Sequence, residues 1–413
     1  MGYQQGLSGL SGASNALDVI GNNIANANTV GFKSSTAQFA DMYANSVATS
    51  TNTQIGIGTA LNAVEQNFGQ GTINSSSSSL DVAINGNGFF QMSNNGVTTY
   101  SRDGTFQRDK NGYIVDSQGR NLMGYAANTG GVINTAQTVP LQAPTTNISP
   151  TATTKISAQF NLNSQDTTPT KTPFSATDNT TYNYSTSIQV YDSLGGSQAV
   201  NMYFVKSAAG TWEAYAGVQG GATTDLGTVN FNSSGTIQST TTGTPPTPTT
   251  SVGQFQFTVP NTDGSATPQS LTLDLTGTTQ YGGKDGVNNL AQDGYASGTL
   301  TTYTIGTDGK LTGNYSNGQT AVLGQIALAN FNNPNGLVNL GGNQYAESSA
   351  SGVPQISAPG STNHGTLQGS ALENSNVDLT SQLVNLITAQ RNYQANAQTI
   401  KTQQTVDQTL INL

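Results

Sequence analysis

The sequence predicts a mainly β protein with α-helical termini, and three observations predict this fold class. Apolar residues recur at helical spacing near the start of the chain and again in its last forty residues. The region between these segments is divided by many Gly-containing turn pairs, which are typical of short strands. A Pro/Thr-rich stretch, 140–150, divides that region in turn. The predicted architecture is nested and multidomain, with terminal coiled-coil-like helices around two β-rich domains, so the termini are expected to meet.

The N-terminal segment predicts a helix that ends before Gly31. Its apolar residues follow alternating steps of three and four, which is the spacing of a helix seam. Asn and Gly residues from Gly21 onward disfavour helix and indicate where it ends. The seam positions are Tyr3, Leu7, Leu10, Leu17 and Ile24, and Ile20 also falls at helical spacing.

The C-terminal segment predicts a longer helix of the same kind. Neither Pro nor Gly interrupts residues 370–413, and Asn376 or Asp378 is suited to cap the start of the helix. Its polar side carries Gln and Asn in place of charged residues. The seam positions are Leu379, Leu383, Leu386, Tyr393, Ala397 and Ile400, with Gln390 inside the seam, and Val406, Leu410 and Leu413 resume it after a slip.

The region 81–125 predicts a meander of tight hairpins. Asn-Gly, Asp-Gly or Gln-Gly pairs recur there every seven or eight residues, and short apolar segments lie between them. The pairs are at 87–88, 95–96, 103–104, 111–112 and 118–119.

A second β region predicts an outer domain. Strands are expected near 186–191, 199–205 and 253–259, and the low-complexity stretch 239–251 is expected to be an exposed loop. A Gly/Ser/Pro segment, 351–365, leads into the terminal helix. The expected domains are a terminal helical region with linkers (1–70 and 361–413), a discontinuous β domain (71–145 and 283–360) and an outer inserted β domain (146–282).

Composition argues against several classes of protein. Only 8% of the residues are charged and the formal net charge is −9, which argues against a nucleic-acid partner. The absence of cysteine excludes zinc–thiolate sites and thiol nucleophiles. The first residues lack the basic and apolar regions of a cleavable secretory signal, and no apolar run reaches membrane-spanning length, so membrane insertion is not expected.

Candidate chemical sites are few. The single histidine, His364, lies in a Gly/Ser-rich stretch where an exposed loop position is expected. Asp109, Asn111 and Asp116 superficially resemble calcium ligands, but their spacing is better explained by a turn. No catalytic residue, cofactor or metal is predicted, and an enzyme is not expected. Tyr-rich strands leave a carbohydrate-binding site open as an alternative.

The apolar seams of the terminal helices are the most informative feature. One interpretation is a two-helix hairpin within a single molecule. Two helices alone bury little apolar surface against the entropy lost by ordering them, so we expect the missing surface to come from other copies of the chain. The residues expected to pack between subunits are Leu7, Leu10, Leu17, Ile20, Ile24, Leu379, Leu383, Leu386, Ile387, Tyr393, Ala397, Ile400 and Leu410.

Both ends resemble the bacterial flagellar rod and hook axial proteins. "LDVIGNNIANANTVGFK" (17–33) resembles the N-terminal signature of that family, and "ALENSNVDLTSQLVNLITAQRNYQANAQTIKT" (371–402) resembles its C-terminal counterpart. "GNGFFQM" and "YSRDGTFQRDKNGYIVDSQGRNLMGY" resemble its first β domain. "TPFSATDNTTYNYSTSIQVYDSLGG" and "LGQIALANFNNPNGL" are similar to the hook branch in particular. The matching signature residues are Asn22, Asn23, Asn26, Gly31, Phe32, Lys33, Gln390, Arg391 and Asn392.

The resemblance implies a structural subunit that polymerises with itself into a curved tube around an export channel and passes motor torque to the filament. It also implies a distal rod protein, a hook–filament junction protein, a hook cap protein during assembly and the flagellar type III export apparatus as partners. The implied location is extracellular, on the flagellum. One alternative is a distal rod protein of the same family, which lacks room for an outer domain. An alternative from another class is a secreted adhesin or carbohydrate-binding protein.

Overall fold

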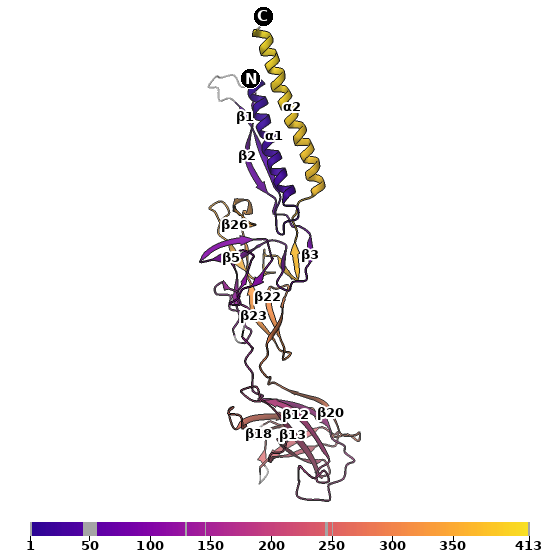
Figure 1. The fold of residues 1–413 in the computed structure, drawn as a ribbon. Helices are drawn as coiled ribbons and strands as arrows, with labels where there is room; N and C mark the ends of the chain where they lie inside the picture. The colour runs from indigo at the N-terminus through magenta and orange to yellow at the C-terminus, as the bar shows by residue number, and fades with distance from the viewer. Residues whose placement is uncertain are drawn as a thin grey trace. The chain divides into compact units, whose positions relative to one another are not determined.

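The computed structural model describes residues 2–43, 56–128, 130–144, 146–243, 247–249 and 251–411 (Figure 1). Its helices are α1 (Gly2–Ala25) and α2 (Leu379–Ile411), and the elements described between them are strands apart from one 3-10 turn, Pro334–Gly336. The predicted fold class, mainly β with helical termini, is therefore confirmed. Leu413 lies outside the described residues, and Leu410 lies in α2 with its side chain outside the described part.

The start of α2 is fixed by Asp378. Its Oδ1 accepts hydrogen bonds from the backbone N–H groups of Thr380 (2.9 Å) and Ser381 (3.3 Å), and its Oδ2 accepts one from Ser381 Oγ (2.8 Å). Of the two predicted caps, Asp378 is therefore the one used, because a side-chain oxygen must satisfy the first free N–H groups of the helix.

The Asp378 cap predicts a pH dependence of α2. Hydrogen bonds from Ser381 and from the Thr380 backbone hold the pKa of Asp378 below its model value of 3.8. Since the pKa of the folded form is the lower one, the cap stabilises the helix above the unfolded value and is lost as the pH falls through the folded value. The helix signal in circular dichroism should fall in that acid range. Asp378→Asn, which still caps but does not titrate, should remove the contribution of this residue. An identical acid transition in the variant would contradict the role of this carboxylate.

The first unit of the chain contains a hairpin that the sequence did not predict. Strands β1 (Ser35–Tyr43) and β2 (Gly56–Gln66) pair antiparallel, from Ser35 opposite Gln66 to Tyr43 opposite Gly56. The prediction of linkers in 1–70 is wrong for these residues. Register shifts in the ladder interrupt the alternation of apolar and polar residues, so the strand pattern is not visible in the sequence.

The rest of the first unit is a large mixed arrangement of short strands around an apolar core. The main path of its thirteen-stranded sheet runs β21–β22–β23–β9–β5–β6–β26–β25, and β3 pairs with β29 and β4 with β28 outside it. The core includes Val82, Phe90, Leu122, Ile326 and Leu328. The strands are β3 (Ile73–Ser75), β4 (Val82–Asn85), β5 (Phe89–Asn94), β6 (Val97–Ser101), β7 (Gln107–Arg108), β8 (Ile114–Val115), β9 (Asn121–Ala126), β10 (Val139–Pro140), β21 (Leu300–Ile305), β22 (Lys310–Tyr315), β23 (Thr320–Ile326), β24 (Leu328–Asn330), β25 (Val338–Gly341), β26 (Gln344–Ala346), β27 (Gln355–Ser357), β28 (Thr366–Gly369) and β29 (Ala371–Glu373).

The predicted meander is only partly correct. Asn95 and Gly96 join β5 to β6 with φ values of 50° and 88°, the left-handed conformation that a tight hairpin turn requires. The pairs at 111–112 and 118–119 also lie in turns between paired strands. The pairs at 87–88 and 103–104 form no hairpin, because β4 pairs with β28 and β6 is followed by a loop.

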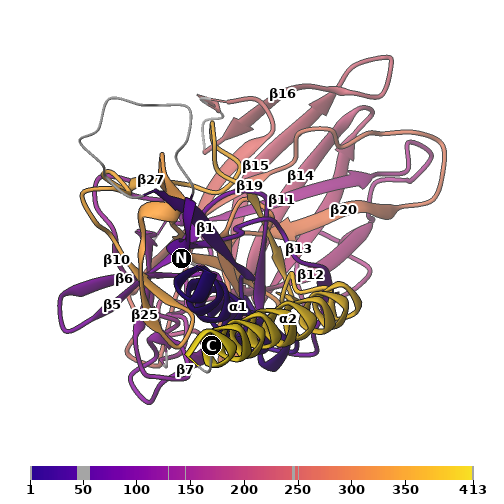
Figure 2. The same cartoon turned by 90° about the horizontal axis from the view of Figure 1, so that it is seen from above.

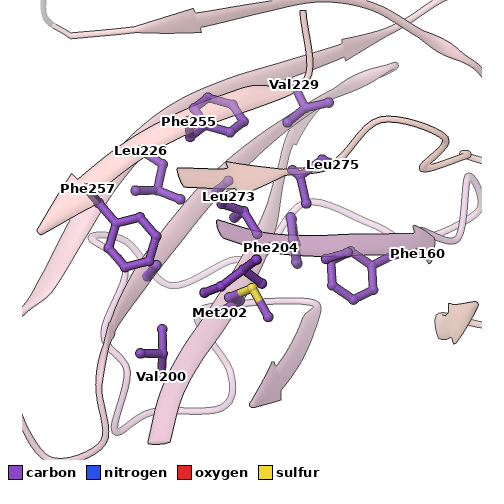
Figure 3. Close-up of a cluster of buried hydrophobic side chains, with 14 of the residues drawn as sticks. Phe160, Val200, Met202, Phe204, Leu226, Val229, Phe255, Phe257, Leu273 and Leu275 are labelled. Atoms are coloured by element: carbon purple, nitrogen blue, oxygen red, sulfur yellow. The ribbon is translucent and has the colours of Figure 1, made fainter. Parts of the chain in front are cut away.

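The second unit comprises residues 146–300 with 315–319 and is built from two sheets. The six-stranded sheet β12–β13–β14–β15–β16–β17 is antiparallel throughout, and the other sheet has the order β18–β19–β11–β20. Apolar side chains from both sheets, such as Phe204, Phe255 and Leu273, form one buried core (Figure 3). The strands are β11 (Lys155–Asn161), β12 (Tyr184–Tyr191), β13 (Ser197–Ala208), β14 (Thr211–Val218), β15 (Thr223–Phe231), β16 (Ile237–Thr242), β17 (Thr247–Pro248), β18 (Gln254–Val259), β19 (Gln269–Asp274) and β20 (Gly286–Gln292).

Two predictions about this second unit need correction. Strand β20 pairs along β11, so residues 283–300 lie with the second unit and the predicted boundary at 283 is too early. The stretch 239–251 is not simply a loop, because Thr241 and Thr242 of β16 pair with Pro248 and Thr247 of β17. The first unit contains residues 1–145, 301–314 and 320–413, so the division of its helical region from its β domain stays a prediction.

Candidate interaction surface on the terminal helices

The two terminal helices lie side by side and run antiparallel (Figures 1 and 2). Asn23 Nδ2 is 3.5 Å from Gln382 Oε1 near one end of the pair, and Gly6 approaches Ile400 near the other. At about 1.5 Å per residue, α1 is about 36 Å long and α2 about 50 Å. The last two turns of α2 therefore extend past the start of α1.

Small residues of α1 allow this close approach. A Cβ atom built on Gly6 would lie 2.9 Å from Ile400 Cγ1, and one built on Gly9 would lie 2.7 Å from Asn396 Oδ1. Gly12 faces the hairpin, where its Cβ would lie 3.3 Å from Thr59 Cγ2. The predicted leucine seam is therefore not what joins the helices within one chain. The recurrence of glycine at every third position was the signal in the sequence, and we read it only as a weak helix. A groove of about 380 Å³ follows this contact, lined by Gly9, Gly12, Ala13, Ala16, Phe39, Thr59, Ala389, Asn392, Ala395 and Asn396.

A bulky residue at Gly9 should separate the helices. Gly9→Leu raises the intrinsic helix propensity of α1 by about 1 kcal/mol, yet its side chain must displace Asn396. We expect the helix signal in circular dichroism to fall, since the Gly-rich α1 depends on its packing against α2 and the hairpin. Ser11→Leu, on the exposed side of α1, is the matched control and should keep or raise that signal. A rise in both variants would show that propensity, not packing, governs α1.

Apolar side chains of α2 remain uncovered on the face away from α1. Leu379, Leu383 and Ile387 recur every four residues and are 47%, 45% and 50% exposed. We call these three residues the open stripe. Ala389, which faces α1, is by contrast buried. Folding of one chain therefore leaves part of the predicted seam in contact with water, at an unfavourable free energy that burial would remove.

The other residues expected to pack between subunits divide into two groups. Some are exposed like the open stripe, and others are half-buried by neighbouring elements of the same chain. The exposed group is Leu7, Tyr393 and Ala397, and the half-buried group is Leu10, Leu17, Ile20, Ile24, Leu386 and Ile400.

A buried ion cluster joins the segment after α1 to the segment before α2. Lys33 Nζ lies 2.7 Å from Glu373 Oε1 and also donates to the carbonyl oxygen of Gly69 (2.8 Å). Arg102 Nη1 lies 3.3 Å from Glu373 Oε2, and the N–H of Gly71 donates to Glu373 Oε1 (2.8 Å). The side chains of Lys33 and Glu373 are fully buried, and that of Arg102 is 3% exposed. One carboxylate therefore balances two buried cations.

Burial of this cluster acts on its charges. Desolvation lowers the pKa of Lys33, and the nearby Arg102 lowers it further, while the Glu373 carboxylate acts in the opposite direction. Desolvation likewise lowers the pKa of Arg102. Glu373 is what keeps both cations charged in this position, and sequence reasoning missed it because its partner Lys33 lies 340 residues away.

The flagellar signature residues Gly31, Asn23 and Phe32 surround the same junction. Gly31 has φ of 69°, and a Cβ there would lie 2.7 Å from the backbone nitrogen of Asp103, so only glycine fits. Its N–H donates to the carbonyl oxygen of Glu373 (2.8 Å). Asn23 is buried and exchanges two hydrogen bonds with the backbone of Ser35, and the N–H of Asn376 lies 3.4 Å from Phe32 O.

The remaining signature residues lie on or just beyond the helices. Asn26 Nδ2 donates to Asn22 O (2.9 Å), and Asn26 Oδ1 accepts from Thr29 Oγ1 (3.1 Å), so this pair shapes the end of α1. Gln390, Arg391 and Asn392 are exposed on α2, and Asn392 also lines the groove beside α1. Their roles stay predictions.

The candidate chemical residues occupy structural positions. Asp109 and Asp116 accept backbone hydrogen bonds within their own turns, the former from Asn111 (2.9 Å) and the latter from Gln118 (2.9 Å). The ring nitrogens of His364 lie 3.3 Å from Ser361 O and 2.9 Å from Gln355 O. In the part of the chain that the structure describes, no three His, Cys, Asp or Glu side chains gather as metal ligands. No described helix has the length and apolar character to cross a membrane.

Comparison with known proteins identifies the family. Flagellar family models match along the chain: "Flagella basal body rod protein" over residues 4–33, "Flagellar hook protein FlgE/F/G D1 domain" over 83–158, "Flagellar basal body protein FlaE D2 domain" over 161–295 and "Flagellar basal body rod FlgEFG protein C-terminal" over 368–413. The flagellar hook protein of Salmonella typhimurium is 43% identical over 425 residues, with both chains fully covered.

The chain belongs to the flagellar hook protein family. The hook protein of Escherichia coli K12 is 41% identical with full coverage of both chains, and that of Treponema pallidum is 31% identical over 99% of this chain and 98% of its own. As a member of the hook protein family, the chain is a structural subunit of the bacterial flagellar hook. The distal rod protein and the secreted adhesin are not favoured, because full-length relatives at this identity are hook proteins.

Proposed function

We propose that copies of this chain assemble head-to-tail into a curved, hollow helical tube that bends while it transmits torque from the rod to the filament. The open stripe of α2 carries this proposal. A stable monomer would cover Leu379, Leu383 and Ile387, whereas heterologous contacts between identical copies bury them and extend without closing. The same contacts would cover Leu7 and Tyr393.

The terminal helices are proposed to form the inner layer around a central export channel. Exposed residues of α2 include Gln390, Gln394, Gln398 and Gln404, which are polar and uncharged. Such side chains suit both helix packing between identical copies and the wall of a water-filled channel, because repeated like charges would accumulate repulsion.

The proposed partners follow from the place of a hook in the flagellum. They are the distal rod protein at the base, the hook–filament junction protein at the far end, the hook cap protein during assembly and the flagellar type III export apparatus. We propose that the chain is exported without a cleavable signal, is extracellular, and has no catalytic activity, cofactor, nucleic-acid partner or membrane insertion.

Bending is proposed to occur where the β units of neighbouring copies slide. The ion pairs among the described residues of the second unit are Lys155–Asp274 and Lys171–Asp178, and each joins residues of the same unit. A surface of Ser, Thr, Asn and Gly forms contacts that can shift register at little cost, unlike buried ion pairs with fixed geometry.

Electron microscopy of the assembled chain tests this function. The purified full chain, concentrated in physiological salt, should form hollow tubes that curve, and the gene should restore motility to a bacterium that lacks its hook gene. Cysteine pairs introduced to join the second units of neighbouring copies should straighten and stiffen the tubes, which is possible because the chain has no cysteine of its own. Solid or unbranched closed particles, or tubes whose bending ignores the cross-links, would contradict the proposal.

A further inference from the structure

Two carboxylates from different turns meet in the second unit. Asp192 lies in the turn between β12 and β13, and Asp263 lies in the loop between β18 and β19. A Cβ atom built on Gly196 would lie 2.4 Å from Asp192 Oδ2 and 3.1 Å from Asp263 Oδ2, so both oxygens border the same small space. Asp192 is only 2% exposed, and neither carboxylate takes part in an ion pair among the described residues.

Each carboxylate uses its other oxygen to hold its own turn. Asp192 Oδ1 accepts from the N–H groups of Leu194 (2.8 Å) and Gly196 (2.9 Å), and Asp263 Oδ1 accepts from the N–H of Ser265 (3.0 Å). These bonds orient both Oδ2 atoms toward the shared space. Two like charges at such a separation repel one another unless a cation or a proton is present.

A buried hydroxyl without a partner points to a ligand at the same place. Ser265 is 6% exposed, and its Oγ forms no hydrogen bond within the described structure. This hydroxyl lies close enough to Asp263 to help hold the pKa of that carboxyl below its usual range, although it does not meet the geometry of a hydrogen bond. A buried oxygen of this kind requires an explanation, and a bound cation supplies one.

The two turns are also fixed to one another. The N–H of Ala266 donates to Ser193 Oγ (3.1 Å), and Gln198 Nε2 donates to Asn261 Oδ1 (2.7 Å). The three oxygens therefore belong to a rigid framework and need little rearrangement to bind.

We propose that Asp192 Oδ2, Asp263 Oδ2 and Ser265 Oγ bind one calcium ion, with water completing its coordination. Carboxylate and hydroxyl oxygens are hard ligands, and Ca²⁺ accepts six to eight oxygens in irregular geometry, whereas Mg²⁺ demands a near-ideal octahedron. With three protein ligands the site should have the affinity of an extracellular module.

A second carboxylate pair in the same unit shows the contrast. Burial raises the pKa of Asp285, and the neighbouring Asp166 raises it further, so that a proton relieves their repulsion. Asn163 donates its side-chain amide to Asp166 Oδ1 (2.9 Å) and its N–H to Asp285 Oδ1 (2.7 Å). No unpartnered buried hydroxyl faces that pair among the described residues.

Calorimetric titration of the dilute full chain with CaCl₂ tests the site. We expect one site with a Kd of about 10⁻⁴–10⁻³ M, and weaker binding of Mg²⁺ at the same concentrations. Asp263→Asn, at an exposed position, should weaken Ca²⁺ binding about tenfold or more, and Ser265→Ala should weaken it while keeping both charges. Asp225→Asn is the matched control, because Asp225 is exposed in the same unit and accepts only from the N–H of Gly227 (2.9 Å).

A thermal measurement gives an independent readout. The single tryptophan, Trp212, is buried in the second unit, so its fluorescence follows the unfolding of that unit. CaCl₂ should raise the unfolding midpoint by a few degrees in the parent chain and in Asp225→Asn, and EDTA should reverse the shift. Absence of any Ca²⁺ effect, or an equal effect in Asp263→Asn, would overturn the proposal.

Discussion

Replacing Glu373 with Gln is expected to lower the free energy of unfolding of the first unit by about 3–5 kcal/mol. The substitution keeps the shape of the side chain but removes the only charge that balances Lys33 and Arg102 in the buried ion cluster. Two uncompensated buried cations then remain, and their desolvation is no longer offset. Lys33→Met should cost less, because Glu373 keeps Arg102 as its partner.

Urea unfolding of the dilute chain measures this effect. Far-UV circular dichroism follows both units, whereas Trp212 fluorescence follows only the second, so the Glu373→Gln transition should move in the first signal and stay in place in the second. Glu347→Gln makes the same chemical change at an exposed glutamate and should shift the midpoint little. Equal effects of the two variants would show that the ion cluster does not hold the two ends together.

The double variant Leu383→Asn/Ile387→Asn is expected to abolish tube assembly. These side chains belong to the open stripe, and each should contribute about 1.5–3 kcal/mol per subunit when another copy buries it. Their loss should raise the concentration needed for assembly by about 100-fold or more. Sedimentation and electron microscopy measure that concentration directly.

The control for the open stripe uses the same helix. Gln398→Asn places the same residue type in α2 at an exposed polar position and should leave assembly unchanged. The monomeric double variant should keep the Trp212 fluorescence and the strand signal of the parent chain, since neither residue is buried within one molecule. Normal tubes from the double variant would exclude the open stripe as an assembly surface.

Periodicity in the sequence predicted the elements whose determinants are local. The apolar spacing near both termini gave α1 and α2, and Asn95–Gly96 gave the β5–β6 hairpin, because three to four neighbouring residues decide each of them. The β1–β2 hairpin was missed because its ladder shifts register twice and its residues are mostly not buried, so no alternating pattern marks it.

The parts of the site that depend on distant residues could not be predicted. Lys33 was recognised only as a signature residue, whereas its role follows from Glu373, which the fold brings to it from 340 positions away. The glycines of α1 appeared unfavourable for a helix, and only the position of Asn396 and Ile400 shows that they let α2 approach. By contrast, the exposure of Leu379 and Leu383 agrees with the expectation that one chain cannot cover its own seam.

Amide hydrogen exchange on the dilute monomer and on assembled tubes tests most directly whether the terminal helices depend on other copies. In the monomer, residues around the buried ion cluster, such as 31–34 and 371–374, should exchange slowly, whereas amides in α1 and α2 should exchange fast. In tubes, the amides of both helices should become protected by a factor of about 100 or more, as the 3 kcal/mol or so gained by burial implies. Helices that are equally protected in the monomer and in the tubes would contradict this account.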